Sequence, residues 1–432
     1  MPLTVLSDFD VQALLVSLKK AEIEELQHNL AEALHDYSTG DTNSSCCSSY
    51  QPQRTVIKRK GVTTLFMPAS TRESLGMKIV ALEAPEDPAW KGETSASLTS
   101  AMSGVSRSES ASTTKSSASS ISGASFRPPA SVASSSSSTP RGTLTMLDQS
   151  GLPTGLVNAE ELTAFRTALA STMIFRKRHN VHNILVFGSG KQARWHIRLA
   201  LLLRGSDIKH INIINRSFDR SLSLMKEFQL PSKQNEQWQS SAKFSALTPN
   251  SQDYTRLLKE EVRKADAIFC CTPSLHPLFP AEYLTSPEGR KKGRYLSAIG
   301  SYAPHMAELH PDILRQAVQP DQHHHHHHKH ASRAGVVVVD SLDACLREAG
   351  EIIQAGLKPA QLVEIGELLM IKKAAMQEKE LGGPGEEGLR DWLFRGNVLY
   401  KSVGLGLMDL RVGWDLLALA RERGIGTTIL DF

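Results

Sequence analysis

The chain has 432 residues, more than the roughly 250–300 at which one hydrophobic core stops growing, so we expect two domains or one domain with insertions. Its apolar content of 40% and charged content of 22% are typical of a folded, soluble protein, and its net charge is only +4. Because it has neither a long stripe of one charge sign nor an apolar run of ~20 residues, we expect no nucleic-acid partner and no membrane span.

The N-terminal part of the chain predicts a helix followed by a small antiparallel sheet. Residues 8–36 carry apolar side chains at helical spacing, which indicates one amphipathic helix. The segments 54–59, 63–70 and 76–85 are short and apolar or alternating, and turn residues bound them. This pattern is typical of strands, which we expect to pair antiparallel.

A serine-rich segment then interrupts the sheet. Residues 86–140 consist mainly of Ser, Thr and Ala, and such a composition cannot bury enough apolar surface to offset its ordering entropy. We therefore predict a disordered insertion there. Residues 142–157 read as strand, turn and strand, so the sheet resumes directly beyond the insertion.

The middle of the chain changes to strands that alternate with helices. Asn158 is a suitable N-cap for a helix of about five turns, and short apolar strands begin after Val181. Six such strands are predicted: 183–188, 211–217, 242–247, 265–274, 294–300 and 335–340. Strands in this alternation predict an α/β fold with a doubly wound parallel sheet of the Rossmann type.

Histidines and cysteines give no metal site. His323–His328 lie inside the chain, in a predicted low-complexity loop at 320–333, and no Cys or ordered acidic partner accompanies them. Five cysteines are present without metal-ligand or disulfide spacing: Cys46, Cys47, Cys270, Cys271 and Cys345. A reducing compartment is therefore expected, and the cytoplasm is the simplest location.

The C-terminal part of the chain is predicted to be helical. Residues 341–356 predict the last crossover helix of the parallel sheet. Residues 400–424 predict a final helical stretch, which we expect to pack back on the N-terminal unit.

A glycine-rich turn follows the first predicted strand of the parallel sheet, 183–188, and leads into a helix. Its sequence matches G-x-G-x-x-A. Gly188 allows the tight turn, Gly190 lets the backbone approach a pyrophosphate, and the small Ala193 lets the helix pack close to the strand. The N-terminus of that helix then faces the phosphates. The predicted dinucleotide-binding residues of this turn are Gly188, Ser189, Gly190, Gln192 and Ala193.

The end of the second strand favours one nucleotide. NAD sites usually place a carboxylate there, whereas this chain has Asn215, Arg216 and Ser217. Without a carboxylate to repel a 2′-phosphate, and with Arg and Ser as donors, NADP(H) is preferred and NAD(H) remains an alternative. Arg216 as an ordinary surface residue is the plainer interpretation. Thr272 and Ser274 end the fourth strand and either line the nicotinamide pocket or form a generic turn.

Nine motifs, taken in chain order, resemble those of the ornithine cyclodeaminase and mu-crystallin family. They are TTLFMPA, GMKIV, ELTAFRTALAS, ILVFGSGKQARWH, INRS, CTPS, IGSYAPHMAEL, EAGEII and YKSVGLGLMDL. The resemblance implies a homodimer in which a domain built from both chain ends binds substrate and a Rossmann domain carries the nicotinamide. The implied substrate-binding and dimerisation domain spans 1–160, the Rossmann domain 161–355, and a helical part at 356–432 returns to the first domain.

The family resemblance also implies roles for three cations. Arg54 and Lys78 would hold the substrate carboxylate or polarise the reacting group, and Arg166 would touch both substrate carboxylate and cofactor. Arg166 lies on an otherwise apolar helix face, where an unpaired cation is costly, so a partner or ligand is expected in any case. Lys78 taken alone reads as a strand residue that points into solvent.

One departure from the family pattern limits the chemistry. Ornithine cyclodeaminases have an Asp base at the position of Tyr302, and a tyrosine with a pKa near ~10 does not replace it easily. We therefore expect a reductase that transfers a hydride from a nicotinamide to a small imino acid, or runs the reverse amino-acid oxidation. The alternatives are an ornithine cyclodeaminase that recycles NAD and a non-catalytic protein that binds NADPH or a small ligand.

Overall fold

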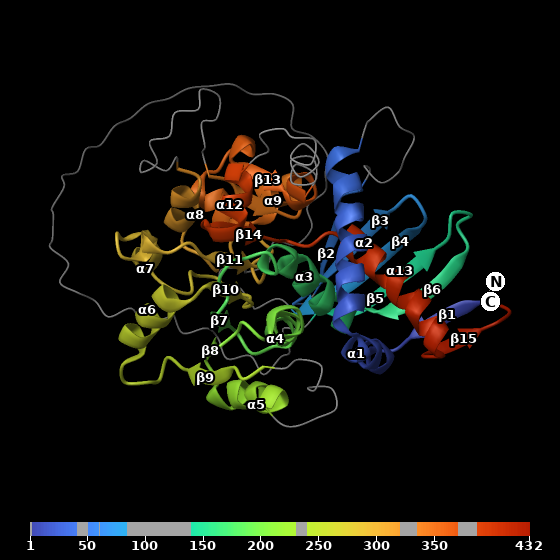
Figure 1. Ribbon diagram of the computed structural model, residues 1–432. Helices are drawn as coiled ribbons and strands as arrows, with labels where there is room; N and C mark the ends of the chain where they lie inside the picture. The colour runs from blue at the N-terminus through green and yellow to red at the C-terminus, as the bar shows by residue number, and fades with distance from the viewer. Residues whose placement is uncertain are drawn as a thin grey trace, which may run out of the picture.

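A computed structural model describes residues 2–40, 51–59, 61–83, 140–229, 240–319, 335–369 and 387–432. Within these residues the chain forms two β-sheets, one of seven strands and one of eight, with helices packed between and around them (Figure 1). The predicted serine-rich insertion, except for Pro140, and the predicted histidine-rich loop at 320–333 lie outside the described residues.

The eight-stranded sheet has the order β13-β12-β14-β11-β10-β7-β8-β9, and every neighbouring pair is parallel. Its strands are β7 (Asn183–Phe187), β8 (His210–Ile214), β9 (Lys243–Leu247), β10 (Ala267–Cys270), β11 (Tyr295–Ala298), β12 (Val337–Val339), β13 (Leu362–Glu364) and β14 (Val398–Lys401). The predicted fold class, a doubly wound parallel sheet with a second α+β unit, is confirmed.

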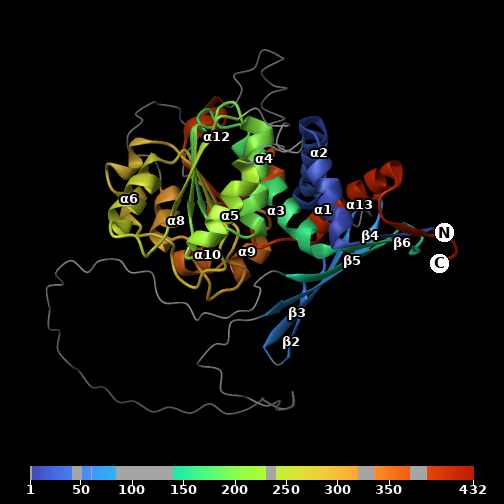
Figure 2. The same cartoon turned by 90° about the horizontal axis from the view of Figure 1, so that it is seen from below.

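Helices cover both faces of the parallel sheet. Figure 2 shows α4 and α5 on one side of the strands and α6 and α8 on the other. The helices of this unit are α4 (Lys191–Arg204), α5 (Phe218–Gln229), α6 (Tyr254–Lys264), α7 (Glu282–Thr285), α8 (Pro311–Ala317), α9 (Leu342–Glu348), α10 (Gly350–Ala355) and α12 (Glu387–Arg395), with short 3₁₀ turns at Gly289–Lys291 and Pro359–Gln361. All six predicted strands are present. The central strands are buried because both faces are covered, whereas the edge strands β9 and β13 are only partly buried.

The parallel sheet continues past the boundary predicted at residue 355. Strands β13 and β14 both lie beyond it, and β14 inserts between β11 and β12. The helix predicted over 400–424 is therefore wrong at its start, since the chain is a strand up to Lys401 and the helix begins at Gly406. The apolar run Val398–Tyr400 is too short to show by periodicity alone whether it is strand or helix.

The seven-stranded sheet has the order β15-β1-β6-β5-β4-β3-β2. Its strands are β1 (Leu3–Leu6), β2 (Thr55–Arg59), β3 (Val62–Ser70), β4 (Leu75–Glu83), β5 (Arg141–Leu147), β6 (Pro153–Asn158) and β15 (Thr427–Ile429). The predicted antiparallel pairing from β2 to β6 is confirmed. The terminal strands β1 and β15 were not predicted; they pair with each other, so both chain ends lie side by side (Figure 1).

Helices α1 (Asp8–Ser17), α3 (Ala159–Phe175) and α13 (Gly406–Arg423) pack on one face of this sheet. Helix α2 (Lys20–Thr39) lies on the same side and packs against α13 and α3 (Figure 2). The single helix predicted over 8–36 is wrong, because the chain is extended at Leu18 and a new helix begins at Lys20. Leu18 is fully buried, so the apolar pattern runs through the break and hides it. No described helix is long and apolar enough to cross a bilayer.

Candidate functional site

The glycine-rich turn joins β7 to α4 as predicted. Gly188 has a φ of +105°, and a side chain there would lie 3.0 Å from the carbonyl oxygen of Cys271. Gly190 is the N-cap of α4, and no atom lies within 4 Å of the position that a Cβ would take. The first turn of α4 carries neither a capping side chain nor an acidic residue. The first N–H groups of α4 are therefore left without a capping side chain and fit the phosphates of a dinucleotide.

The end of β8 closes around this turn. The amide of Asn215 donates to the hydroxyl of Ser189 at 2.7 Å and to the carbonyl of Ser217 at 2.9 Å. Arg216 is exposed and makes no ion pair within the described ranges. The predicted residues of the turn and of the β8 end are thus brought together, with the Arg216 guanidinium available to an anion.

Two further predicted residues, Thr272 and Ser274, follow β10 at the same edge of the sheet. The backbone N–H of Thr272 donates to Glu308 at 2.8 Å, and the hydroxyl of Ser274 donates to the carbonyl of His276 at 2.5 Å. Thr272 also touches the space beside Gly188, since its methyl group lies 3.0 Å from where a Cβ there would be. The loop after β10 therefore lies beside the glycine-rich turn.

Glu308 was not predicted, yet it ties two strand ends together. Its side chain is fully buried and accepts hydrogen bonds from three backbone N–H groups: Thr272 (2.8 Å), Gly300 (2.7 Å) and Ser301 (3.3 Å). Burial raises the pKa of Glu308 to about 8, while the nearby Lys401 opposes this shift and Glu351 adds to it. This carboxyl group positions the loops that follow β10 and β11.

Lys401, at the end of β14, extends the same buried cluster. Its Nζ donates to the carbonyl oxygen of Ser301 at 2.6 Å and lies 3.5 Å from a carboxylate oxygen of Glu351. Both Lys401 and Glu351 are almost fully buried. The carboxyl ends of β10, β11 and β14 are thus held in one arrangement by paired charges.

The predicted cations Lys78 and Arg166 meet at a single buried carboxylate, Asp409 of α13. Lys78 Nζ lies 2.7 Å and Arg166 Nε 3.2 Å from Asp409 Oδ1. Lys78 does not point into solvent, since only 2% of the residue is exposed. The other carboxylate oxygen, Asp409 Oδ2, is buried and accepts no hydrogen bond within the described residues. Two cations therefore share one anion, and one acceptor is left over.

The electrostatics of this cluster lower the pKa of Lys78. Burial lowers it to about 8, the Asp409 carboxylate opposes that shift, and the Arg166 guanidinium adds to it. A lysine with such a pKa is largely protonated at neutral pH yet gives up its proton readily.

The guanidinium of Arg166 lies at the carboxyl end of the parallel sheet. Asp340, which follows β12, accepts from the N–H of Gly404 at 2.7 Å and from the hydroxyl of Ser402 at 2.6 Å. These bonds fold the loop after β14 so that Gly404 takes a φ of +88°, and a side chain there would lie 2.8 Å from Arg166 Nη2. Only glycine leaves room for the guanidinium at this point.

The third predicted cation, Arg54, pairs with a different carboxylate. It directly precedes β2 and forms an ion pair with Glu348 at the end of α9, where Nε to Oε1 is 3.0 Å. Its Nη2 also donates to the carbonyl oxygen of Tyr302 at 3.4 Å. Arg54 thus joins the seven-stranded sheet to the carboxyl ends of the parallel strands.

Asp409 is the main site residue that sequence reasoning missed. It lies in the motif YKSVGLGLMDL, to which no residue role was given. A usable signal was present, because an acidic residue between Met408 and Leu410 on a buried helix face needs a cationic partner. Glu308 (between Ala307 and Leu309), Glu351 (before Ile352) and Asp340 (after Val339) carried a similar signal, and no role was given to them either.

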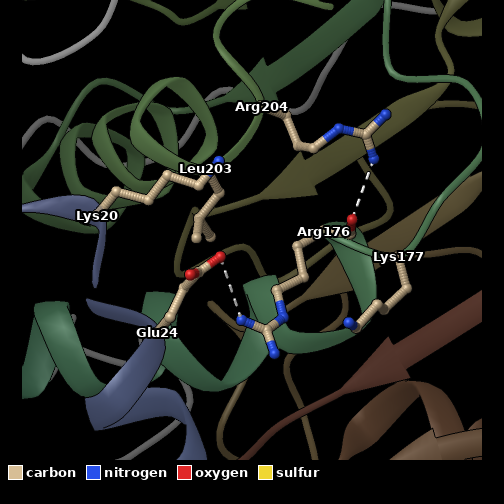
Figure 3. A pocket seen from close by; sticks show the side chains of 6 residues that line it. All are labelled: Lys20, Glu24, Arg176, Lys177, Leu203 and Arg204. Carbon is tan, nitrogen blue, oxygen red and sulfur yellow. Dashed lines mark hydrogen bonds and ion pairs between the residues drawn. The ribbon is translucent and has the colours of Figure 1, made fainter. Parts of the chain in front are cut away.

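A surface hollow lies apart from this site. Figure 3 shows it lined by four cations, one carboxylate and one leucine: Lys20, Arg176, Lys177, Arg204, Glu24 and Leu203. Arg204 donates to the carbonyl oxygens of Arg176 and Arg178 beyond the end of α3, and Arg176 pairs with Glu24. Arg204 thus satisfies carbonyl groups that follow the C-terminus of α3.

Comparisons with known proteins identify the family and the fold. The model of the ornithine cyclodeaminase/mu-crystallin family matches residues 130–373. A Δ1-pyrroline-2-carboxylate reductase of Bacillus cereus is 27% identical over 299 residues, covering 67% of this chain and 74% of that protein.

Two solved structures share the fold. The Thermococcus litoralis Δ1-pyrroline-2-carboxylate reductase in complex with NADH and L-proline has a TM-score of 0.62 at 18% identity, covering 99% of this chain and 100% of that one. An archaeal alanine dehydrogenase dimer with bound NAD has a TM-score of 0.64 at 16% identity, with both chains fully covered. The family model matches more than half of this chain, so the chain belongs to the ornithine cyclodeaminase/mu-crystallin family.

Proposed function

We propose that this protein is a nicotinamide-dependent reductase that converts a small α-imino acid into the amino acid, or runs the reverse oxidation. The observation that carries the proposal is the buried group of Lys78, Arg166 and Asp409 at the carboxyl end of a parallel sheet with an open phosphate cradle. The similarity to proteins named Δ1-pyrroline-2-carboxylate reductase supports it.

Each residue of the site has a defined task in this reaction. Arg166 holds the substrate carboxylate, because a guanidinium makes two parallel hydrogen bonds to that group. The ammonium of Lys78 gives its proton to the imine nitrogen, while the adjacent carbon would receive the hydride that a nicotinamide supplies when bound. The C=N double bond becomes a C–N single bond, and Lys78 regains its proton from solvent. Asp409 keeps Lys78 and Arg166 in place and balances one of their two charges.

The glycine-rich turn, the loop with Thr272 and Ser274, and the end of β8 would hold the cofactor. The enzyme is proposed to prefer NADPH over NADH. Asn215 is engaged with Ser189, and Arg216 is exposed beside it, so a 2′-phosphate would meet a cation and no carboxylate. NADH is the alternative cofactor that this arrangement does not repel.

The seven-stranded sheet is proposed to form a homodimer. Its helices pack on one face, and within the described residues the other face presents apolar side chains that include Ile57 (50% exposed), Leu75 (42%) and Met77 (40%). A contiguous apolar sheet face of this kind is typical of a protein–protein interface. The archaeal alanine dehydrogenase with the same fold is a dimer.

One experiment separates the proposed reaction from the alternatives. Purified protein is mixed with NADPH or NADH and a set of cyclic imino acids, or pyruvate with ammonia, and oxidation of the nicotinamide is followed by absorbance. A parallel reaction holds ornithine and catalytic NAD, and free ammonia is measured. Oxidation of NADPH with an imino acid supports the reductase. Ammonia and proline from ornithine would contradict it, and tight NADPH binding without any turnover would indicate a non-catalytic binding protein.

A further inference from the structure

The strand that carries Lys78 continues into an apolar surface on the same face. Side chains alternate along a strand, so Val80 and Leu82 face the same side as Lys78. The register of β3 and β4 sets Met67 opposite Lys78 and Leu65 opposite Val80. The rows next to the ammonium group are therefore aliphatic.

Tyr302, from the loop after β11, packs against this surface. Leu65, Met67, Val80 and Leu82 form a small hydrophobic cluster separate from the main cores, and the Tyr302 ring lies on it. We call these five side chains the apolar wall. Burial raises the pKa of Tyr302, which Arg54 lowers in part, so its hydroxyl stays neutral at physiological pH.

Three described carboxylates that hold the cations and loops around the apolar wall already have partners. Asp409 holds Lys78 and Arg166, Glu348 holds Arg54, and Asp340 accepts hydrogen bonds from the loop after β14. A second ammonium group on a substrate would lose its hydration there. The one oxygen of these carboxylates that lacks a donor among the described residues, Asp409 Oδ2, belongs to a group whose charge Lys78 and Arg166 already share. A second carboxylate would have to compete with Glu348 for Arg54. Burying either charged group next to an aliphatic surface is unfavourable.

We propose that the apolar wall receives the substrate side chain and that the enzyme selects α-imino acids with uncharged, apolar side chains. Those with a second ammonium or carboxylate group are excluded. This inference rests on the proposed imine reduction, whose residues Lys78 and Arg166 fix the carboxylate and nitrogen beside the wall. A pocket contact with one methylene group discriminates by about 10-fold to 200-fold, and leaving a charge unpaired adds to that.

Three amino acids of equal chain length test the wall. Norvaline, ornithine and glutamate share the α-amino acid group and end in a methyl, an ammonium and a carboxylate group. Their dissociation constants are measured by calorimetry on the NADPH-loaded protein, and their inhibition constants are measured against reduction of a cyclic imino acid. Norvaline should bind at least about tenfold more tightly than the other two. Equal affinity for all three would overturn the inference.

A matched pair of variants assigns the selection to Tyr302. Tyr302→Asp and Tyr302→Asn remove the same ring and leave side chains of nearly equal size, but only Asp adds a charge. Both should weaken norvaline binding, and only Tyr302→Asp should improve the binding of ornithine relative to norvaline. An unchanged ratio of the two affinities in Tyr302→Asp would contradict the inference.

The two measurements also separate this inference from the proposed function. If imino acids are reduced but norvaline has no advantage, the apolar wall does not select and the reductase proposal stands. If no imino acid is reduced, the reductase proposal fails, while calorimetry still reports whether the apolar amino acid is preferred.

Discussion

Replacing Asp409 by Asn removes the negative charge that keeps Lys78 protonated in a buried site. The pKa of Lys78 is about 8 with Asp409 present, 2.7 Å from its ammonium group. An opposite charge at such a distance moves a pKa by about 1–3 units. In Asp409→Asn the pKa of Lys78 should therefore fall to roughly 5–7, a change of about 1.4–4 kcal/mol in the cost of protonation.

The consequence appears in the pH dependence of imine reduction. Protonated Lys78 is the proposed proton donor, so the reductive kcat/KM is present below its pKa and is lost as pH rises through it. In the wild type, the alkaline decline of kcat/KM, its alkaline limb, should lie near pH 8, because burial lowers the pKa of Lys78 to about 8. In Asp409→Asn that limb should move to lower pH, and at pH 7 the reductive kcat/KM should fall by about twofold to a hundredfold, in line with a 1–3 unit shift. Activity should recover toward pH 5.

The assay measures kcat/KM from pH 5 to pH 10 by nicotinamide absorbance, with NADPH affinity as a check on folding. Asp415→Asn is the matched control, because it removes one carboxylate from the same helix where Asp415 pairs with Arg411 at 2.7 Å, away from Lys78. Its alkaline limb should coincide with that of the wild type. An unchanged alkaline limb in Asp409→Asn would refute the assignment of Lys78 as the donor whose pKa Asp409 sets.

Four further outcomes are expected. Lys78→Ala should lower reductive kcat by about 10²–10⁴-fold and leave the NADPH affinity, measured by calorimetry, nearly intact. Loss of both kcat and NADPH affinity would show that the lysine is structural. Arg216→Asp should shift the ratio of NADPH to NADH affinity toward NADH by about 10-fold to 100-fold, and a fixed ratio would remove Arg216 from the cofactor site. Met77→Glu should weaken the proposed dimer in light scattering without loss of fold, and an unaffected dimer would exclude this sheet face. Because burial raises the pKa of Glu308 to about 8, the folded state keeps a proton that the unfolded state loses, so thermal stability should fall as pH rises from about 5 to 8. Glu308→Gln should flatten that dependence.

Much of the fold follows from local patterns in the sequence. The apolar runs that became β7, β8 and β10, the Gly188–Gly190 turn and the Asn158 cap are each specified within a few residues. Asn158 accepts from the N–H of Glu160 at 2.9 Å, as an N-cap does. Such features depend on neighbours along the chain, so a sequence reveals them directly.

The pairing of buried charges was decided only by the tertiary structure. The sequence indicated that Arg166 needs a partner, but Asp409 lies 243 residues away from it and 331 residues away from Lys78. Arg54 likewise finds Glu348 across 294 residues. The cost of burying a cation requires that some anion be near, yet it does not say which, because the choice depends on how α13, α3 and β4 pack together. The insertion of β14 between two earlier strands depends on the same long-range packing, and no local periodicity encodes it.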